Sequence, residues 1–256
     1  MKTSREKKSP VQALSALHES ASLRAITGPS LRPGGFLLTD RGLSLSGFSP
    51  GARILDVGCG TGASVEYLRR KHRFRALGID MSRCLFREAG DADSIPLAVA
   101  RAETLPFPDC CCEGILCECV LSLVKEPKQA MGEFSRVLRP DGFLILSDVY
   151  DRLQHPGHLR EPATSCGCPS MLHSQSSIKK LLEDSGLELL VWEDHTRYLK
   201  ELAAQLILSG DSLAEIHELC DVFDPGCSGL SGSRLFPAGY FLLVARKSTK
   251  GEFFSG

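Results

Sequence analysis

Three glycines spaced by two residues stand between a short apolar segment and an amphipathic one, within residues 54–62 (ILDVGCGTG). Glycines permit a tight turn and let a ligand approach the backbone closely, and a helix that starts there offers free N–H groups. Asp80 closes the next apolar segment, 22 residues after Gly58. A carboxylate at that place can accept both ribose hydroxyls of an adenosine. The spacing therefore predicts a nucleoside site, against the plainer alternative of a turn without a ligand.

The looser glycine pattern of nicotinamide dinucleotide sites also fits residues 58–63 and would make the chain an oxidoreductase. Asp56 argues against this alternative because it lies inside the preceding strand, two residues before the first glycine. A carboxylate buried there requires a cationic partner and would repel a pyrophosphate. The ammonium group of S-adenosylmethionine is such a partner, so these residues favour that cofactor over a dinucleotide.

An alternation of strands and helices must position this loop. Strands are predicted over residues 53–57, 74–79, 97–100, 114–117, 143–149, 187–192 and 240–246. Helices are predicted over residues 11–25, 40–45, 63–71, 83–89, 127–138, 177–185, 196–208 and 212–222. This order predicts an α/β fold, a Rossmann-like seven-stranded and mostly parallel sheet with helices on both faces. The last strand is expected to be antiparallel and to lie beside the fifth.

The chain length of 256 residues suits one medium domain built in three parts. Residues 1–50 are expected to form an N-terminal helix and connector, and residues 51–149 the cofactor-binding core. Residues 150–256 are expected to supply an acceptor-side loop, further helices and the last strands of the same domain. The N-terminal helix and the late insertions would together form a lid.

Composition narrows the class of protein. The net charge of −1 gives no overall attraction to nucleic acid or to an acidic membrane. The longest apolar run, residues 239–245, is too short to span a bilayer, and no apolar signal core follows the charged start, so a cytoplasmic protein is expected. Eleven cysteines, an odd number without a C-x-x-C pair, argue against a disulfide framework and against a structural metal site.

Four motifs in order resemble those of the class I S-adenosylmethionine-dependent methyltransferases, over about residues 53–149. They are LDVGCGTG at 55–62, GIDMS at 78–82, AETLPFPD at 102–109 and RVLRPDG at 136–142. In style they are similar to small-molecule enzymes such as the ubiquinone/menaquinone C-methyltransferases and the arsenite methyltransferases. The resemblance implies transfer of a methyl group from S-adenosylmethionine to a small-molecule acceptor, with S-adenosylhomocysteine as the product.

The resemblance also implies which residues contact the cofactor. They are Asp56, Gly58, Cys59, Gly60 and Gly62 at the methionine part, Asp80 at the ribose, Met81, Ala102 and Glu103 at the adenine, and Cys117 beside the methyl-bearing sulfur. One departure stands at Arg101, where the family often has an aspartate that accepts the adenine amino group. Backbone atoms or Glu103 are expected to recognise the adenine instead.

The acceptor is expected at the carboxyl ends of the fourth and fifth strands, where ligands of such sheets bind. The candidates for catalysis are Glu118, Asp148 and Tyr150. Methyl transfer mainly requires the nucleophile on axis with the methyl group, and it needs a general base only for a protonated acceptor. His195 is a further acceptor-side candidate, with a plainer alternative as the cap of the next helix.

Two alternatives to this enzyme remain open. Thiolates from Cys119, from Cys166 or Cys168, and from Cys220 or Cys227 could bind a soft metalloid such as arsenite, although free thiols are more often ordinary core residues. The chain could instead be a catalytically silent cofactor-binding module that regulates a partner. Methylation of amino groups on nucleic-acid bases is not expected, because residues 117–120 (CECV) lack the Asn/Asp-Pro-Pro-Tyr/Phe tetrad. The acceptor and the oligomeric state are left open.

Overall fold

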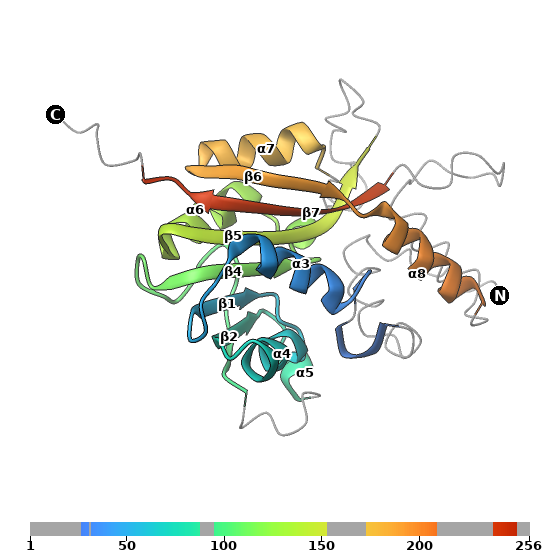
Figure 1. The fold of residues 1–256 in the computed structure, drawn as a ribbon, viewed down its shortest axis with the longest axis horizontal. Coiled ribbons are helices and arrows are strands. Elements are labelled where there is room, and N and C mark those ends of the chain that lie inside the picture. Colours follow the sequence, from blue (N-terminus) through green and yellow to red (C-terminus); the bar gives the residue numbers. More distant parts are fainter. Residues whose placement is uncertain (1–26, 31, 88–94, 153–172, 209–237, 250–256) are drawn as a thin grey trace, which may run out of the picture.

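A seven-stranded sheet runs through the centre of the computed structural model, which describes residues 27–30, 32–87, 95–152, 173–208 and 238–249 (Figure 1). Its order is β3-β2-β1-β4-β5-β7-β6, and its neighbours pair in parallel except β7, which is antiparallel to β5 and β6. The strands are β1 (Arg53–Val57), β2 (Arg75–Asp80), β3 (Leu97–Val99), β4 (Cys112–Glu118), β5 (Leu138–Asp151), β6 (Leu187–Asp194) and β7 (Ala238–Lys247). The predicted Rossmann-like sheet and the antiparallel last strand beside the fifth are confirmed.

Helices cover both faces of this sheet (Figure 1). Leu43 of α3 and Leu68 of α4 share one apolar cluster with strand residues, whereas Phe134 of α6 and Leu182 of α7 belong to another. The helical elements are η1 (Gly28–Ser30), α3 (Phe36–Ser46), α4 (Ala63–Lys71), α5 (Arg83–Arg87), η3 (Leu121–Leu123), α6 (Pro127–Val137), α7 (Gln175–Asp184) and α8 (Thr196–Leu208). Burial of both faces explains why β7 has a nearly continuous run of apolar residues.

Two strand side chains on the α3/α4 face belong to the site. Successive residues of a strand point to opposite faces of the sheet. Ile54 and Leu116 belong to the apolar cluster under α3 and α4. Asp56 and Glu118, two residues further along β1 and β4, therefore point to that same face, at the ends of their strands.

The same alternation places three expected site residues on the opposite face. Cys117, Leu146 and Tyr150 belong to the apolar cluster under α6 and α7. Asp148 lies between Leu146 and Tyr150 at the same two-residue spacing and shares their side of β5. The structure thus separates Cys117, Asp148 and Tyr150 from Asp56 and Glu118 by the thickness of the sheet.

Two elements differ most in extent from their prediction. The helix expected at residues 40–45 is α3, which starts after the left-handed Gly35 and ends at Gly47, whose φ of 64° suits a glycine cap. Strand β5 begins at Leu138 rather than at Phe143. The turn expected at residues 140–142 is instead part of the strand, where the pairing of β5 with β4 shifts in register and Asp141 has a φ of 59°.

Part of the expected lid falls outside the described residues. The helices predicted at 11–25 and 212–222 lie outside the described residues, as does most of the long loop after Tyr150. Within the described ranges, no helix is both long and apolar enough to cross a membrane.

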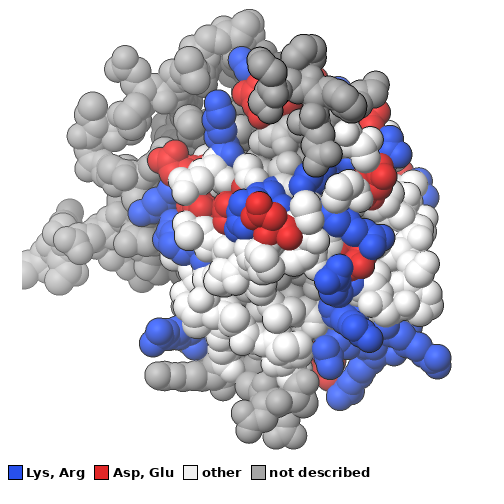
Figure 2. All heavy atoms as spheres, turned by 90° about the vertical axis from the view of Figure 1, so that its left-hand side faces the viewer, with Lys and Arg blue, Asp and Glu red and all other residues white. Residues whose placement is uncertain are grey.

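Figure 2 shows the edge of the molecule at the amino ends of the parallel strands, where Lys and Arg side chains gather with Asp and Glu among them. Arg53 and Arg139 both pair with Glu113, at 3.1 and 3.0 Å. Exposed pairs of this kind contribute about 0–1 kcal/mol each. This edge lies opposite the carboxyl ends of the strands, so its charges are remote from the expected site.

Candidate functional site

A cavity of about 300 Å³ opens where β1, β2 and β4 end. Its size is at the lower end of the range for small-ligand sites. Four carboxylates and two guanidinium groups line it, together with the glycine loop and apolar side chains; the charged ones are Asp56, Asp80, Glu103, Glu118, Arg32 and Arg101. An excess of carboxylates favours a ligand that carries positive charge.

The glycine loop between β1 and α4 forms one wall of the cavity. Gly58 and Gly60 have φ values of 75° and 54°, in the left-handed region that favours glycine. A Cβ at Gly58 would overlap the side chain of Val120, whereas one at Gly60 would meet open space. The backbone thus lies bare toward the cavity at Gly60, as a ligand that packs on it requires.

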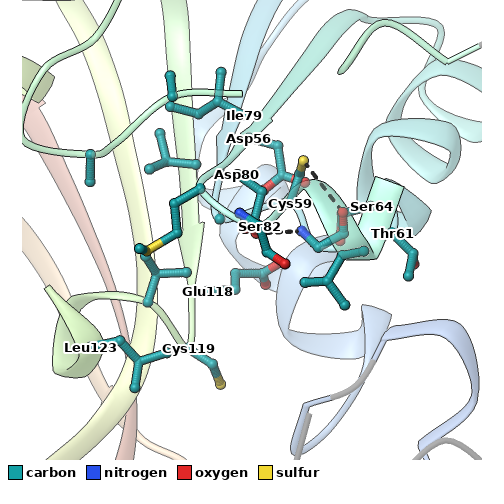
Figure 3. A pocket seen from close by; sticks show the side chains of 18 of the residues that line it. Asp56, Cys59, Thr61, Ser64, Ile79, Asp80, Ser82, Glu118, Cys119 and Leu123 are labelled. Carbon is teal, nitrogen blue, oxygen red and sulfur yellow. Dashed lines mark hydrogen bonds between the residues drawn. The ribbon is translucent and has the colours of Figure 1, made fainter. Parts of the chain in front are cut away.

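Asp80 ties this loop to the end of β2. Its Oδ2 accepts the N–H of Gly60 at 2.9 Å, and its Oδ1 accepts the N–H of Ser82 at 2.8 Å. A carboxylate offers about four lone-pair sites, so both oxygens keep acceptor capacity for a ligand. Figure 3 shows Asp80 and Ser82 beside the pocket, with Asp56 and Glu118 nearby.

Asp56 is a buried carboxylate whose hydrogen bonding is incomplete among the described residues. It is 3% exposed, lines the cavity, and its Oδ2 has no hydrogen-bond partner among the described residues. Burial, and next the charge of Glu118, raise the pKa of Asp56 to about 8, although Arg32 opposes the rise. A buried carboxylate in this state gains most from a cationic ligand.

Glu118 is held by a buried network from the segment before α3. Arg32 pairs with it at 2.7 Å, and Thr39 donates its hydroxyl to it at 3.0 Å. Arg32 also donates to the hydroxyl of Ser64 at 3.0 Å. Burial raises the pKa of Glu118, while Arg32 and Thr39 oppose the rise.

At the other end of the cavity, Arg101 pairs with Glu103 at 2.9 Å. The backbone carbonyl of Glu103 accepts from Gln129 at 2.9 Å, which fixes this turn on α6. Met81 stands at the rim, 66% exposed. The departure at Arg101 is thus accommodated by an ion pair two residues away.

Comparison with known proteins matches this architecture to one family. A family described as "Methyltransferase domain" matches residues 55–146. The uncharacterized methyltransferase YodH of Bacillus subtilis is 30% identical over 176 residues, which are 66% of this chain and 73% of YodH. The chain belongs to the class I S-adenosylmethionine-dependent methyltransferases.

Two other proteins similar to this methyltransferase family member share less sequence identity with it than YodH does. An arsenite methyltransferase of Halobacterium salinarum is 26% identical over 57% of this chain and 39% of its own length. The solved structure of the [4+2]-cyclase SpnF has a TM-score of 0.72 at 22% identity, over 96% of this chain and 99% of SpnF. The aligned part spans only 39–58% of the first three curated relatives.

Most of the cofactor residues expected in this methyltransferase family member line the one cavity. They are Asp56, Gly58, Cys59, Gly60, Asp80, Met81, Ala102 and Glu103. Gly62 lies just behind the loop as the cap of α4, and Cys117 is fully buried on the other face.

Of the three catalytic candidates, only Glu118 lines the cavity. Asp148 accepts from the backbone and hydroxyl of Ser122, and Tyr150 donates to Asp194 at 2.9 Å. The pKa of Asp148 is raised to about 6 by burial. Both side chains therefore bond to other segments of the protein and do not face the cavity.

Cys119 lines the cavity in an unusual conformation. Its φ of 58° is rare for a residue with a side chain, and its thiol lies 3.0 Å from the hydroxyl of Tyr240. Burial first, and then Asp148, raise the pKa of Cys119 to about 12, so the thiol is neutral. His195 instead contacts Glu193 at 2.9 Å, and Asp194, not His195, accepts the N–H of Thr196 at the start of α8.

Arg32, Thr39 and Ser64 were missed by sequence reasoning. Arg32 stands in the turn-rich segment 29–35 (PSLRPGG), where no periodicity marks a buried side chain. Its partner Glu118 is 86 residues further along the chain. A lone arginine between prolines and glycines was the available signal.

Proposed function

We propose that this chain binds S-adenosylmethionine in the cavity and transfers its methyl group to a small-molecule acceptor. Members of the family bind this cofactor. The proposal rests on Asp56, a buried carboxylate that lines the cavity beside the glycine loop and whose Oδ2 has no hydrogen-bond partner among the described residues. An ammonium group satisfies that carboxylate, whereas the pyrophosphate of a dinucleotide would be repelled.

Different residues of the cavity would contact different parts of the cofactor. Asp56 would hold the ammonium group, and the bare backbone around Gly60 would hold the methionine part. Asp80 would accept the ribose hydroxyls while it keeps the loop in place. Met81 and the turn at Ala102 and Glu103 would flank the adenine.

S-Adenosylmethionine, when bound, supplies a methyl group on a positively charged sulfur. The chain contributes orientation, which is worth about 7–11 kcal/mol in well-aligned reactions. Glu118 is already bonded to Arg32 and Thr39 and therefore serves as an anchor rather than as a free base. Acceptors that already carry an available lone pair suit such a site best.

Cofactor affinity should depend on pH through Asp56. Its pKa is raised to about 8 in the ligand-free protein, so it is protonated at pH 6.5. A bound ammonium group favours the ionised form, so binding releases a proton and affinity rises on the order of tenfold from pH 6.5 to pH 8. Calorimetry in buffers of different ionisation enthalpy counts the released protons.

The Asp56→Asn variant is the control for this proton release. It should bind more weakly and lose the pH slope between 6.5 and 8. It should also raise the melting temperature of the ligand-free protein at pH 8, because a raised native pKa makes stability fall as pH rises from about 4 to about 8. An unchanged slope would show that another group titrates.

A silent cofactor-binding module is the rival from another class. The fold alone does not decide between them, since the similar SpnF structure is described as a [4+2]-cyclase. Turnover of S-adenosylmethionine with any small-molecule acceptor separates an enzyme from such a module.

A thiol-seeking metalloid is the second candidate acceptor, favoured by Cys119 at the cavity and by the arsenite methyltransferase relative. The partner cysteines expected for it, Cys166, Cys168, Cys220 and Cys227, lie outside the described residues. Within those residues, no three His, Cys, Asp or Glu side chains group as metal ligands.

Arsenite titration of the reduced protein tests this candidate. Cys119→Ser should weaken binding at least tenfold if three thiolates share the metalloid. Cys110→Ser, at an exposed cysteine outside the cavity, is the matched control. Absence of both arsenite binding and arsenite methylation would remove the metalloid from consideration.

A further inference from the structure

Arg32 reaches into the cavity from the segment before α3 and is only 7% exposed. Its terminal nitrogens donate to Ser64 and Thr39 and pair with Glu118. Its Nε has no hydrogen-bond partner among the described residues. A buried guanidinium N–H without an acceptor is unfavourable. This atom therefore indicates that an anionic group completes the site.

The start of α4 is a second, independent feature that favours an anion. This nine-residue helix begins after Gly62 without a side-chain cap, and Ala63 and Ser64 line the cavity. The first N–H groups of a helix have no partner within the helix and carry partial positive charge. Because Ser64 accepts from Arg32, the guanidinium and the helix start meet at one place.

The cavity thus has two adjoining subsites that favour ligand groups of opposite charge. Among the described residues, one oxygen of Asp56 has no hydrogen-bond partner and favours a cation, and the Nε–H of Arg32 has none and favours an anion. An α-amino acid presents both charges on a single carbon atom. The Asp56 carboxylate and the Arg32 guanidinium would therefore bind the ammonium and the carboxylate of such a zwitterion.

We propose that Arg32, together with the N-terminus of α4, binds the α-carboxylate of the methionine part of S-adenosylmethionine. This rests on the proposed function. Arg32 precedes α3, whose Thr39 also bonds Glu118. Carboxylate binding therefore couples cofactor binding to the docking of α3 on the core.

Decarboxylated S-adenosylmethionine isolates this contact because it keeps the ammonium, sulfonium and adenosine groups. In calorimetric titrations, the wild type should prefer S-adenosylmethionine over this analogue by roughly 10- to 100-fold, the strength of a charge-assisted hydrogen bond. In Arg32→Gln the preference should shrink to about threefold or less. An undiminished preference in Arg32→Gln would overturn the assignment, as expected if Arg32 serves an acceptor's carboxylate instead.

Two further variants keep the test decisive. Arg32→Gln leaves Glu118 buried without its partner, so the Arg32→Gln/Glu118→Gln double variant repeats the comparison without that unpaired charge. Arg41→Gln removes an exposed arginine of α3, which pairs with Glu193, and should leave the preference unchanged.

Hydrogen exchange provides a readout independent of affinity. In the wild type, S-adenosylmethionine should slow exchange of the α3 amides more than the decarboxylated analogue does, and this difference should vanish in Arg32→Gln. Equal protection by both ligands in the wild type would contradict the coupling. A wild type that binds neither ligand would overturn the cofactor assignment itself, whereas binding with equal affinity for both would overturn only the role of Arg32.

Discussion

Glu118→Ala is expected to destabilise the folded protein by about 3–5 kcal/mol, because it leaves Arg32 buried without its counter-charge. The two side chains are 7% and 3% exposed, and arginine cannot shed its proton to relieve the loss. For a chain of this size the melting temperature should fall by about 10 °C. Thermal unfolding followed by circular dichroism measures the change.

The converse variant should be milder. Arg32→Met leaves Glu118 alone, and burial already raises the pKa of that carboxyl, so it can become neutral by taking up a proton. The Arg32→Met/Glu118→Leu double variant should be more stable than Glu118→Ala, since apolar groups replace the whole pair. Arg41→Ala, which breaks the exposed pair with Glu193, should cost less than about 1 kcal/mol. An equal loss of stability on breaking the Arg32–Glu118 pair and on breaking the Arg41–Glu193 pair would contradict the burial of the first pair.

Asp80→Ala is expected to weaken S-adenosylmethionine binding by roughly 100-fold or more. The carboxylate would contribute charge-assisted hydrogen bonds to the ribose, worth about 1.5–3 kcal/mol each. It also accepts from Gly60 and Ser82, so its removal loosens the glycine loop. Titration calorimetry measures the affinity, with the control variant Glu188→Ala at an exposed side chain of the edge strand β6. Retention of wild-type affinity in Asp80→Ala would mean that the ribose lies elsewhere.

The fold and the glycine loop could be predicted because their signals are local. An apolar strand that runs into glycines, followed by a helix and an acidic strand end, needs only about 30 neighbouring residues. Asp56 and Asp80 were identified for the same reason. Both line the cavity in the structure.

The acceptor side could not be predicted in the same way. Strand β5 is buried on both faces, so its apolar run does not reveal which residues point toward the cavity. Asp148 and Tyr150 therefore looked equivalent to Glu118, although they lie on the α6/α7 face. The role of Arg32 could not be predicted, because its ion pair joins residues that are distant in the sequence and close only in the folded structure.

Calorimetric titration of the reduced protein with S-adenosylmethionine and S-adenosylhomocysteine tests whether the cavity at the glycine loop binds this cofactor. We expect micromolar binding, on the order of −8 kcal/mol, that Asp80→Ala weakens by roughly 100-fold or more and that a nicotinamide dinucleotide does not reproduce. Absence of binding by either ligand would contradict this expectation, and the cavity at the glycine loop would then have to serve a different molecule.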